Sequence, residues 1–343
     1  MGVQNSFWLF VVKRLGISLF LLWGVATIMF LAARLVPGDV ISVMLGEEAA
    51  ADPVARQAMI ERFGLDRPMF EQYWIHMANI AQGDFGISMR TRGPVADDLE
   101  RAIPASLELG LLSGAISGII GIFLGTLSAL RRGKLSDQVI RVITVTGISV
   151  PLFWLALLAL YLFNFKLGVF PGIGRLGPGS APPPQVTGMY TVDALIAGDL
   201  ATFSDALMHL LIPGAVLAVF TMTLITRFTR SAVLEVLNED YVRTAKAKGL
   251  SSSRVLFAHV LRAAFVPIVT VLGIMFGAVL AGAVLVEEIF NFPGIGQLMF
   301  QSAVFLDMPG MIGVGLVVAV IYIGISFITD ILYGVIDPRI RVS

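Results

Sequence analysis

Residues 109–130 read LGLLSGAISGIIGIFLGTLSAL, and this run of 22 residues contains no Asp, Glu, Lys or Arg. An α-helix rises about 1.5 Å per residue, so about 20 apolar residues cross the hydrocarbon core of a bilayer, which is about 30 Å thick. Soluble helices rarely run this far without a charged side chain. The run therefore predicts a membrane-spanning helix.

Five further runs share this composition. They contain 19, 24, 21, 24 and 22 residues, again without a charged side chain: Leu15–Ala33, Val142–Phe165, Ala206–Thr226, Ala263–Val286 and Met308–Thr329. Charged residues make up 14% of the 343-residue chain, against about 25% in a typical soluble domain. We expect an all-α polytopic membrane protein with six transmembrane helices.

The distribution of basic residues predicts the orientation. If the N-terminus is cytoplasmic, the inside segments hold fifteen Lys and Arg, whereas the outside loops after the third and fifth helices hold Lys166 and Arg175. By the positive-inside rule, both termini then face the cytoplasm. The first apolar run is also longer than the roughly 7–15 apolar residues of a signal peptide, so we expect an uncleaved first helix.

This orientation divides the chain into three parts. Residues 1–36 form the N-terminus and first helix, residues 37–104 an extracytoplasmic segment, and residues 105–343 a core of five helices. The external segment predicts two helices, Val54–Phe63 and Pro68–Ala81. The second has apolar residues at helical spacing: Phe70, Trp74, Met77 and Ile80.

The last external loop contains an uncharged stretch at 289–306. It includes Asn291, Pro293, Gly294 and Gly296. If the chain crossed the membrane fully here, the basic residues would no longer be concentrated on one side. We expect a helix that dips back toward the membrane, because irregular backbone at membrane depth must line a cavity or be buried in protein.

The cytoplasmic loop at 230–262 is the most informative segment. Asn238 is a predicted helix N-cap, and Gly249 stands where a helix C-terminus favours a left-handed residue. A helix of about ten residues between them presents Tyr241, Thr244, Ala245 and Lys248 on one face. By composition alone, this helix fits a docking surface for another subunit as well as it fits an amphipathic helix on lipid head groups.

The sequence RTAKAKG at 243–249 resembles the EAA loop of importer permeases of the ATP-binding-cassette (ABC) superfamily. Arg243 stands where the general pattern has glutamate, and Arg262 where other branches have proline; both departures suit the peptide-permease branch. In that family the short cytoplasmic helix docks into a groove on the ATPase subunit. The resemblance implies that the coupling residues are Asp240, Tyr241, Arg243, Thr244, Ala245, Lys248 and Gly249.

Six further motifs are similar, in order, to the B-type subunit of dipeptide and oligopeptide permeases. They are RLVPGD at 34–39, GDFGIS at 83–88, IPASLEL at 103–109, SVPLFWL at 149–155, NFPGIG at 291–296 and DPRIR at 337–341. The resemblance implies a type I ABC importer permease fold in the bacterial inner membrane, carrying peptides. It further implies a heterodimer with a second homologous permease, two ATP-binding subunits and an extracytoplasmic substrate-binding protein.

The sequence predicts a non-catalytic subunit. A phosphate-binding loop has the pattern G-x-x-x-x-G-K-[ST], but Gly133-Lys134 is followed by Leu135. We therefore expect ATP hydrolysis in partner subunits. There is no cysteine, the three histidines are widely separated and the net charge is zero, so we expect no metal, no cofactor and no nucleic-acid partner.

Alternative functions remain at this point. The same architecture could import glutathione, a nickel chelate or an oligosaccharide. An ion-coupled secondary transporter would need charges near the middle of its spans and internal repeats, and an intramembrane enzyme would need catalytic groups at depth; the sequence offers neither. Structural roles are expected for the ionisable residues at the ends of the spans: Glu108, His209 and Asp330.

Glycines within the spans predict close packing of helices, and prolines within the spans predict kinks. Pro151, Pro213 and Pro267 are expected to bend their helices. Gly273, Gly277 and Gly282 allow close helix contact, either with the partner permease or within this subunit, and we expect packing rather than gating.

Overall fold

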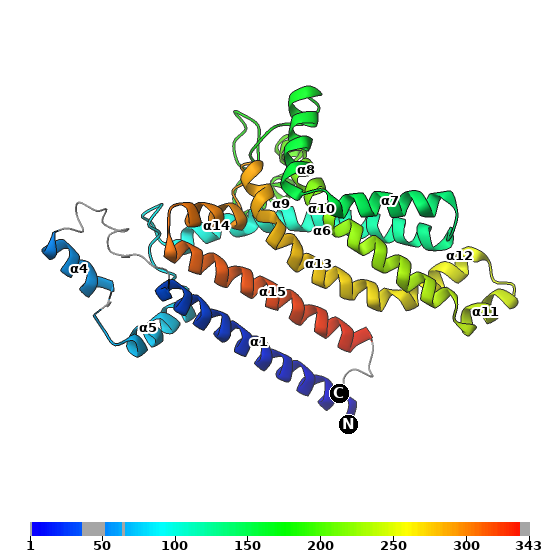
Figure 1. The fold of residues 1–343 in the computed structure, drawn as a ribbon, viewed down its shortest axis with the longest axis horizontal. Helices are drawn as coiled ribbons and strands as arrows, with labels where there is room; N and C mark the ends of the chain where they lie inside the picture. Colours follow the sequence, from blue (N-terminus) through cyan, green and yellow to red (C-terminus); the bar gives the residue numbers. More distant parts are fainter. Residues whose placement is uncertain (1, 36–51, 64–65, 337–343) are drawn as a thin grey trace.

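The structure is a computed structural model that describes residues 2–35, 52–63 and 66–336. Within these residues, all regular elements are helices (Figure 1). The long helices run roughly side by side, and short helices lie at their ends. This arrangement follows from the sequence, because a helix satisfies its own backbone hydrogen bonds inside hydrocarbon.

Four continuous helices are long and apolar enough to cross a membrane. They are α1 (Gly2–Leu35), α6 (Val95–Leu130), α10 (Leu200–Leu237) and α15 (Met308–Ile336). Two further spans are pairs of helices with a bend between them. If each bent pair counts as one span, the described residues contain six spans, the number that the sequence predicts.

The third span is not the single straight helix that the run at 142–165 suggests. Helix α7 (Leu135–Ser149) is followed by α8 (Leu152–Ala159) and the π-helix η1 (Leu160–Lys166), and the chain bends by 101° between them. Pro151 lies at this break, where its missing N–H and its ring interrupt the helical ladder. The kink predicted there is therefore much larger than an ordinary proline bend.

The fifth span bends less sharply. It begins with α12 (Ser252–Arg254) and the π-helix η2 (Val255–Val260), and continues as α13 (Leu261–Ile289). The segments before and after residue 266 differ in direction by 51°, and Pro267 begins the second segment. This bend again agrees with the predicted effect of a proline inside a helix.

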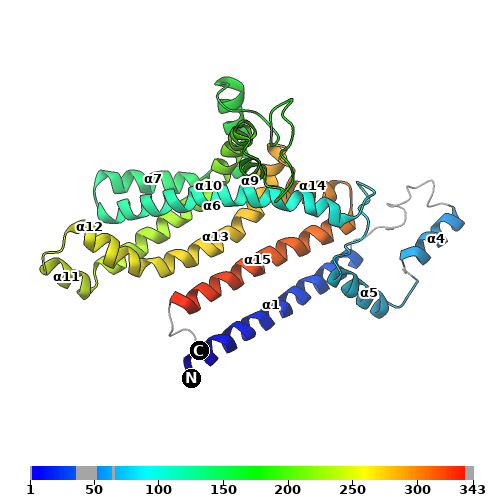
Figure 2. The ribbon, with the colours of Figure 1, turned by 180° about the vertical axis from the view of Figure 1, so that it is seen from behind.

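Helices α6 and α10 form the centre of the subunit, with α13 beside them (Figures 1 and 2). Glycines bring α6 and α10 close together. A Cβ atom on Gly125 would lie 2.6 Å from the carbonyl oxygen of Thr226, and one on Gly121 would lie 2.8 Å from Ile225. Lipid tails are as apolar as the helix surfaces, so the hydrophobic effect does not drive helices together inside a membrane. Close contact between backbones is therefore a main source of helix association.

Glycines of α13 serve the same purpose within this subunit. A Cβ atom on Gly273 would lie 2.6 Å from Oγ1 of Thr329, and one on Gly277 would overlap the ring of Tyr322. Both partners belong to α15, so these two glycines pack against the chain's own last helix. The surroundings of Gly282 lie outside the described side chains.

The short elements gather at two ends of the long axis. The α6–α7 turn, α11 (Asp240–Ala247) and α12 lie at one end, toward which the start of α1 and the end of α15 also point (Figures 1 and 2). At the opposite end lie α4 (Pro53–Phe63), α5 (Met69–Ala81) and α14 (Ile295–Val304). Helix α9 (Tyr190–Ile196) precedes α10.

Several helices that the sequence predicts between the spans are present. Helices α4 and α5 match the two helices predicted between the first and second spans. Helix α14 has 10 residues and is about 15 Å long, which is too short to cross the membrane. Gly64, most of the motif at 34–39 and the motif at 337–341 lie outside the described residues.

Replacing Gly125 with alanine tests the close contact between α6 and α10. The added methyl group meets rigid backbone, so Gly125→Ala is expected to lower the free energy of unfolding by about 1–3 kcal/mol. Gly118→Ala on the same helix is the matched control, because its Cβ atom would lie at an ordinary 3.5 Å from Leu272. Thermal unfolding in mild detergent measures both; equal stability of the two variants would contradict the packing described here.

Candidate functional site

Helix α11 is fixed to the body of the subunit by its apolar side. Val242 and Ala245 are buried in a cluster with Val233 of α10 and with Val255 and Val260 of η2. Val233 lies in the last turns of α10, so this cluster joins α11 directly to a central span. A force applied to α11 would therefore reach α10 through packed side chains.

The ends of α11 differ in detail from the sequence expectation. Asn238 was expected to cap α11, but it lies at the C-terminal cap of α10, where its side chain donates to the carbonyl of Leu234. Glu239 occupies the N-cap position of α11 instead. Gly249 has φ +77°, the left-handed conformation expected after a helix C-terminus. Helix α11 thus has 8 residues rather than about ten.

The exposed side of α11 carries most of the predicted coupling residues. The side chains of Asp240 and Arg243 are 92% and 72% exposed and form an ion pair of 3.0 Å. Tyr241, Thr244 and Lys248 are also exposed. Burial of part of the ring and the charge of Glu239 raise the pKa of Tyr241, so its hydroxyl remains protonated at neutral pH.

Ala245 is the exception among these residues. Its exposed fraction is 6%, and it packs inward beside Val242. A residue that is buried against its own subunit cannot contact a partner. Of the four residues expected on the docking face, Ala245 is therefore not available for such a contact. The small side chain at 245 lets α11 approach its own subunit closely.

An ion pair between buried Asp137 and partly exposed Arg230 links α10 to the first turn of α7. Arg230 donates from Nε and Nη2 to the two carboxylate oxygens of Asp137, each at 3.0 Å. Asp137 also accepts hydrogen bonds from Ser128 and from the N–H of Gly133. Arg230 lies seven residues before the end of α10, about 10 Å from the helix terminus that leads to α11. Sequence analysis counted Arg230 among the cytoplasmic charges and assigned it no partner.

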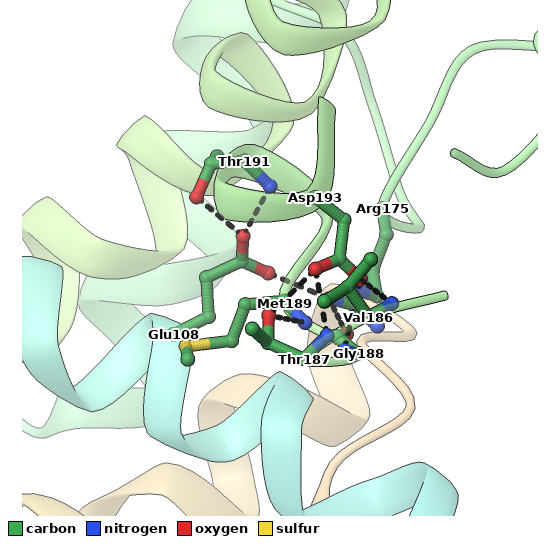
Figure 3. A network of polar contacts seen from close by, with 8 residues as sticks. All are labelled: Glu108, Arg175, Val186, Thr187, Gly188, Met189, Thr191 and Asp193. Atoms are coloured by element: carbon green, nitrogen blue, oxygen red, sulfur yellow. Dashed lines mark hydrogen bonds and ion pairs between the residues drawn. The ribbon is translucent and has the colours of Figure 1, made fainter. Parts of the chain in front are cut away.

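A second polar network forms around Glu108 of α6 (Figure 3). Arg175, from the loop after η1, donates to Oε2 of Glu108 on α6 at 2.6 Å. Glu108 also accepts from the N–H and hydroxyl of Thr191, in the first turn of α9. The guanidinium of Arg175 lies over the ring of Tyr190 at 3.5 Å from its centroid. This network holds the loop after η1 and α9 against α6.

Asp193 organises the neighbouring loop (Figure 3). It accepts hydrogen bonds from the N–H groups of Val186, Thr187 and Gly188 at 2.8–3.2 Å, and from the hydroxyl of Thr187. Burial alone raises the pKa of Asp193, but the hydrogen bonds from Thr187, Val186 and Gly188 outweigh it and hold the pKa below its ordinary value. The ionised carboxylate therefore stabilises this loop.

A buried carboxylate also fixes the start of α14. Glu287 accepts hydrogen bonds from the hydroxyl of Ser106 on α6 and from the N–H of Gly296, and the N–H of Ile295 donates to Ser106. A Cβ atom on Gly294 would overlap the Glu287 carboxyl group. The NFPGIG motif thus provides space for the carboxylate and aims free N–H groups at it.

Three ionisable residues for which the sequence predicts structural roles have partners within the subunit. His209 is buried and lies 2.9 Å from the carbonyl of Asp205. Asp330 pairs with Arg14 of α1 at 3.1 Å. Glu108 is buried in protein, so it does not extend into the lipid head groups as a residue near the interface could. Sequence reasoning missed Arg175 and Glu287, since nothing local in the chain marks their distant partners Glu108 and Ser106. It also missed Asp193, whose partners at 186–188 are near in sequence but lie in an irregular loop without a periodic pattern.

Comparison with known protein families gives two matches. Residues 121–342 match the family "Binding-protein-dependent transport system inner membrane component", and residues 7–110 match the N-terminal part of such membrane components. The matches together cover nearly the whole chain.

Curated relatives match from end to end. A di/tripeptide transport system permease protein of Pseudomonas aeruginosa strain UCBPP-PA14 is 42% identical over 97% of this chain and 98% of its own length. A dipeptide transport system permease protein of Escherichia coli strain K12 is 37% identical over 97% and 98%. A glutathione transport system permease protein of Escherichia coli O1:K1 is 33% identical over 97% and 98%.

One solved structure has a related fold. A chain of the MetNI methionine ABC transporter in an inward-facing conformation superposes with a TM-score of 0.51 and 17% identity, covering 70% of this chain and 96% of that one. The described helices therefore have the fold of a type I ABC importer permease.

The buried ion pair between Glu108 and Arg175 can be tested by a double-mutant cycle. Glu108→Gln and Arg175→Met are each expected to lower the free energy of unfolding by about 3–5 kcal/mol, because each leaves a buried charge unpaired. The double variant should lose less than the sum. The exposed pair Asp240–Arg243 is the control, and its removal should change stability by less than about 1 kcal/mol. Additive losses at 108 and 175 would contradict the pairing.

The loop at 185–189 is expected to loosen in acid. The pKa of Asp193 is lower in the folded protein than the value of about 3.9 in an unfolded chain. Its contribution to stability is thus complete well above pH 4 and is lost as pH falls through the folded pKa. Hydrogen exchange of these amides, corrected for intrinsic rates, should show this loss in the native protein. In Asp193→Asn, protection should be weaker at neutral pH; an unchanged acid response there would refute the assignment.

Proposed function

The chain belongs to the family of binding-protein-dependent transport system inner membrane components, and on this premise we propose that it carries di- and oligopeptides as one half of an ATP-driven import pathway. The observation that supports this substrate is the end-to-end match to permeases named for dipeptides and tripeptides. As a permease subunit the protein is a multi-pass component of the inner membrane.

The proposed assembly supplies what this chain lacks. Its sequence contains no phosphate-binding loop, so ATP is hydrolysed by two separate ATP-binding subunits. A second homologous permease forms the other half of the pathway, and an external binding protein delivers the peptide. The family description, which names dependence on a binding protein, supports the last partner.

In this proposal the end of the subunit that carries α11 faces the cytoplasm. The α6–α7 turn and the starting turns of α1 lie toward the same end and hold Arg131, Arg132, Lys134, Lys13 and Arg14. Such a concentration of basic residues is typical of cytoplasmic segments. Both termini are then cytoplasmic, and α4, α5 and α14 lie on the outer side.

Helix α11 is the proposed contact with the ATPase. Its exposed residues Asp240, Tyr241, Arg243, Thr244 and Lys248 are available to a partner, and Gly249 fixes the turn behind them. The buried side chains of α11 are packed on α10, so movement of an attached ATPase would displace the end of this span. The Arg230–Asp137 pair would pass the displacement on to α6 and α7.

The substrate is tested with the whole importer in vesicles. The cognate permeases, ATPases and binding protein are reconstituted, and ATP-dependent uptake of a labelled dipeptide and tripeptide is measured against glutathione. Uptake of ordinary peptides supports the proposal. Uptake of glutathione alone would replace it with the second candidate, which the match to a glutathione permease favours.

A charge reversal on α11 tests the coupling. Lys248→Glu and Tyr241→Ala alter the proposed contact face, so ATP-driven uptake is expected to fall by about tenfold or more, equivalent to about 1.4 kcal/mol of lost coupling. Lys246→Glu makes the same charge change on the other flank of α11 and should retain most of the uptake. Membrane insertion and stability should be unchanged in all three. Equal uptake by Lys248→Glu and Lys246→Glu would refute the proposed face.

A further inference from the structure

Helix α5 docks onto α1 with one part of an apolar surface. The hydroxyl of Tyr73 lies 2.9 Å from that of Thr27. The rings of Tyr73 and His76 lie 5.5 and 5.4 Å from the ring of Phe30, measured between centroids. These contacts fix the position of α5 along α1.

The apolar surface of α5 continues beyond the part that α1 covers. Phe70 and Trp74 are 71% and 54% exposed, and their rings meet edge to face at 6.1 Å. Ala78 and Ala81 extend this exposed stripe at helical spacing. Asn79 lies on the opposite side of α5, whereas Glu71, three residues before Trp74, lies at the border of the stripe. Helix α5 thus has an apolar surface, of which α1 covers one edge, and a polar side that carries Asn79.

The docking contacts set the depth of α5. The membrane-crossing part of α1 is Trp8–Ala32. Thr27 and Phe30 lie five and two residues before its end, which corresponds to about 7 and 3 Å along the helix axis. Helix α5 therefore touches α1 inside the membrane-crossing stretch, at its outer boundary. Amphipathic helices that lie on a bilayer bury their apolar sides to a similar depth of about 5–10 Å.

We propose that α5 is an interfacial helix whose exposed stripe, Phe70, Trp74, Ala78 and Ala81, inserts into the boundary between head groups and acyl chains. The stripe lies beside α1, whose apolar side chains Phe20, Trp23 and Ile28 are exposed on this subunit, so lipid can reach both surfaces without any other subunit. Trp and Tyr side chains are favoured at this boundary. The polar side with Asn79 then faces water.

Insertion of the stripe would fix the position of the external segment relative to the membrane surface. After α5 the chain reaches Ser88 and Met89, both of which donate to the buried carboxylate of Asp307 before α15. One end of the segment is thus attached to the α14–α15 turn, and the lipid contact would hold the other end at the membrane surface. The proposal requires a membrane-spanning α1 and does not depend on the substrate.

The absence of cysteine allows a direct test, because single cysteines can be introduced without removing any. A nitroxide spin label is attached at Trp74→Cys or Ala81→Cys on the stripe, and at Asn79→Cys on the polar side as the matched control. The full chain is reconstituted in phosphatidylcholine–phosphatidylglycerol vesicles. Collision rates are measured with oxygen, which concentrates in lipid, and with a nickel chelate, which stays in water.

The ratio of oxygen to nickel collisions at 74 and 81 should exceed that at 79 several-fold. Ala81→Cys keeps both aromatic residues of the stripe, so the result does not depend on replacing Trp74. Free access of the nickel chelate at all three positions would show an aqueous surface and overturn the proposal. Exclusion of both reagents at 74 and 81 in the assembled importer would mean that a protein subunit covers the stripe, which also overturns it.

Discussion

The hydrocarbon core of a membrane contains no water, so each polar group placed there must find its partner in the protein. This constraint explains why the spans are helical and why their charged residues, which lie near the ends of the uncharged runs, have partners from other elements. Glu108 is paired with Arg175, and Asp137 with Arg230. Between these polar contacts, glycines such as Gly125 allow the spans to pack closely. Stability thus comes from polar contacts at the ends and close packing between them.

The two ends of the subunit use this constraint differently. At one end, the Arg175 network and the Glu287 carboxylate attach the loop after η1 and α14 to α6, so these short elements are fixed to that span. At the other end, Val242 packs α11 onto α10 and leaves its remaining sides exposed. Short elements fixed at one end and an exposed, firmly attached α11 at the other suit a subunit that receives movement from one side.

Much of the fold could be predicted, because hydrophobic runs and charge sorting are properties of the local sequence. The six runs, the helices α4 and α5 and the short α14 were all predicted on that basis. A hydropathy pattern does not encode the direction of the helix axis, so it could not predict the size of the 101° bend at Pro151. Glu108 and Arg175 are 67 positions apart, and no periodicity connects them. Ala245 was assigned to the exposed face because helical spacing shows which residues share a face, but not whether each of them is exposed or packed against the subunit.

The central claim is that α11 contacts the ATP-binding subunit through the side that carries Tyr241 and Lys248. Photo-crosslinking in the assembled importer tests it most directly, since a single cysteine can carry the reagent in this cysteine-free chain. A short crosslinker at Lys248→Cys should join this chain to the ATPase, with a yield that changes when ATP is bound, and one at Lys246→Cys should give little product. No crosslink from Lys248→Cys, or equal yields at 246 and 248, would contradict the account.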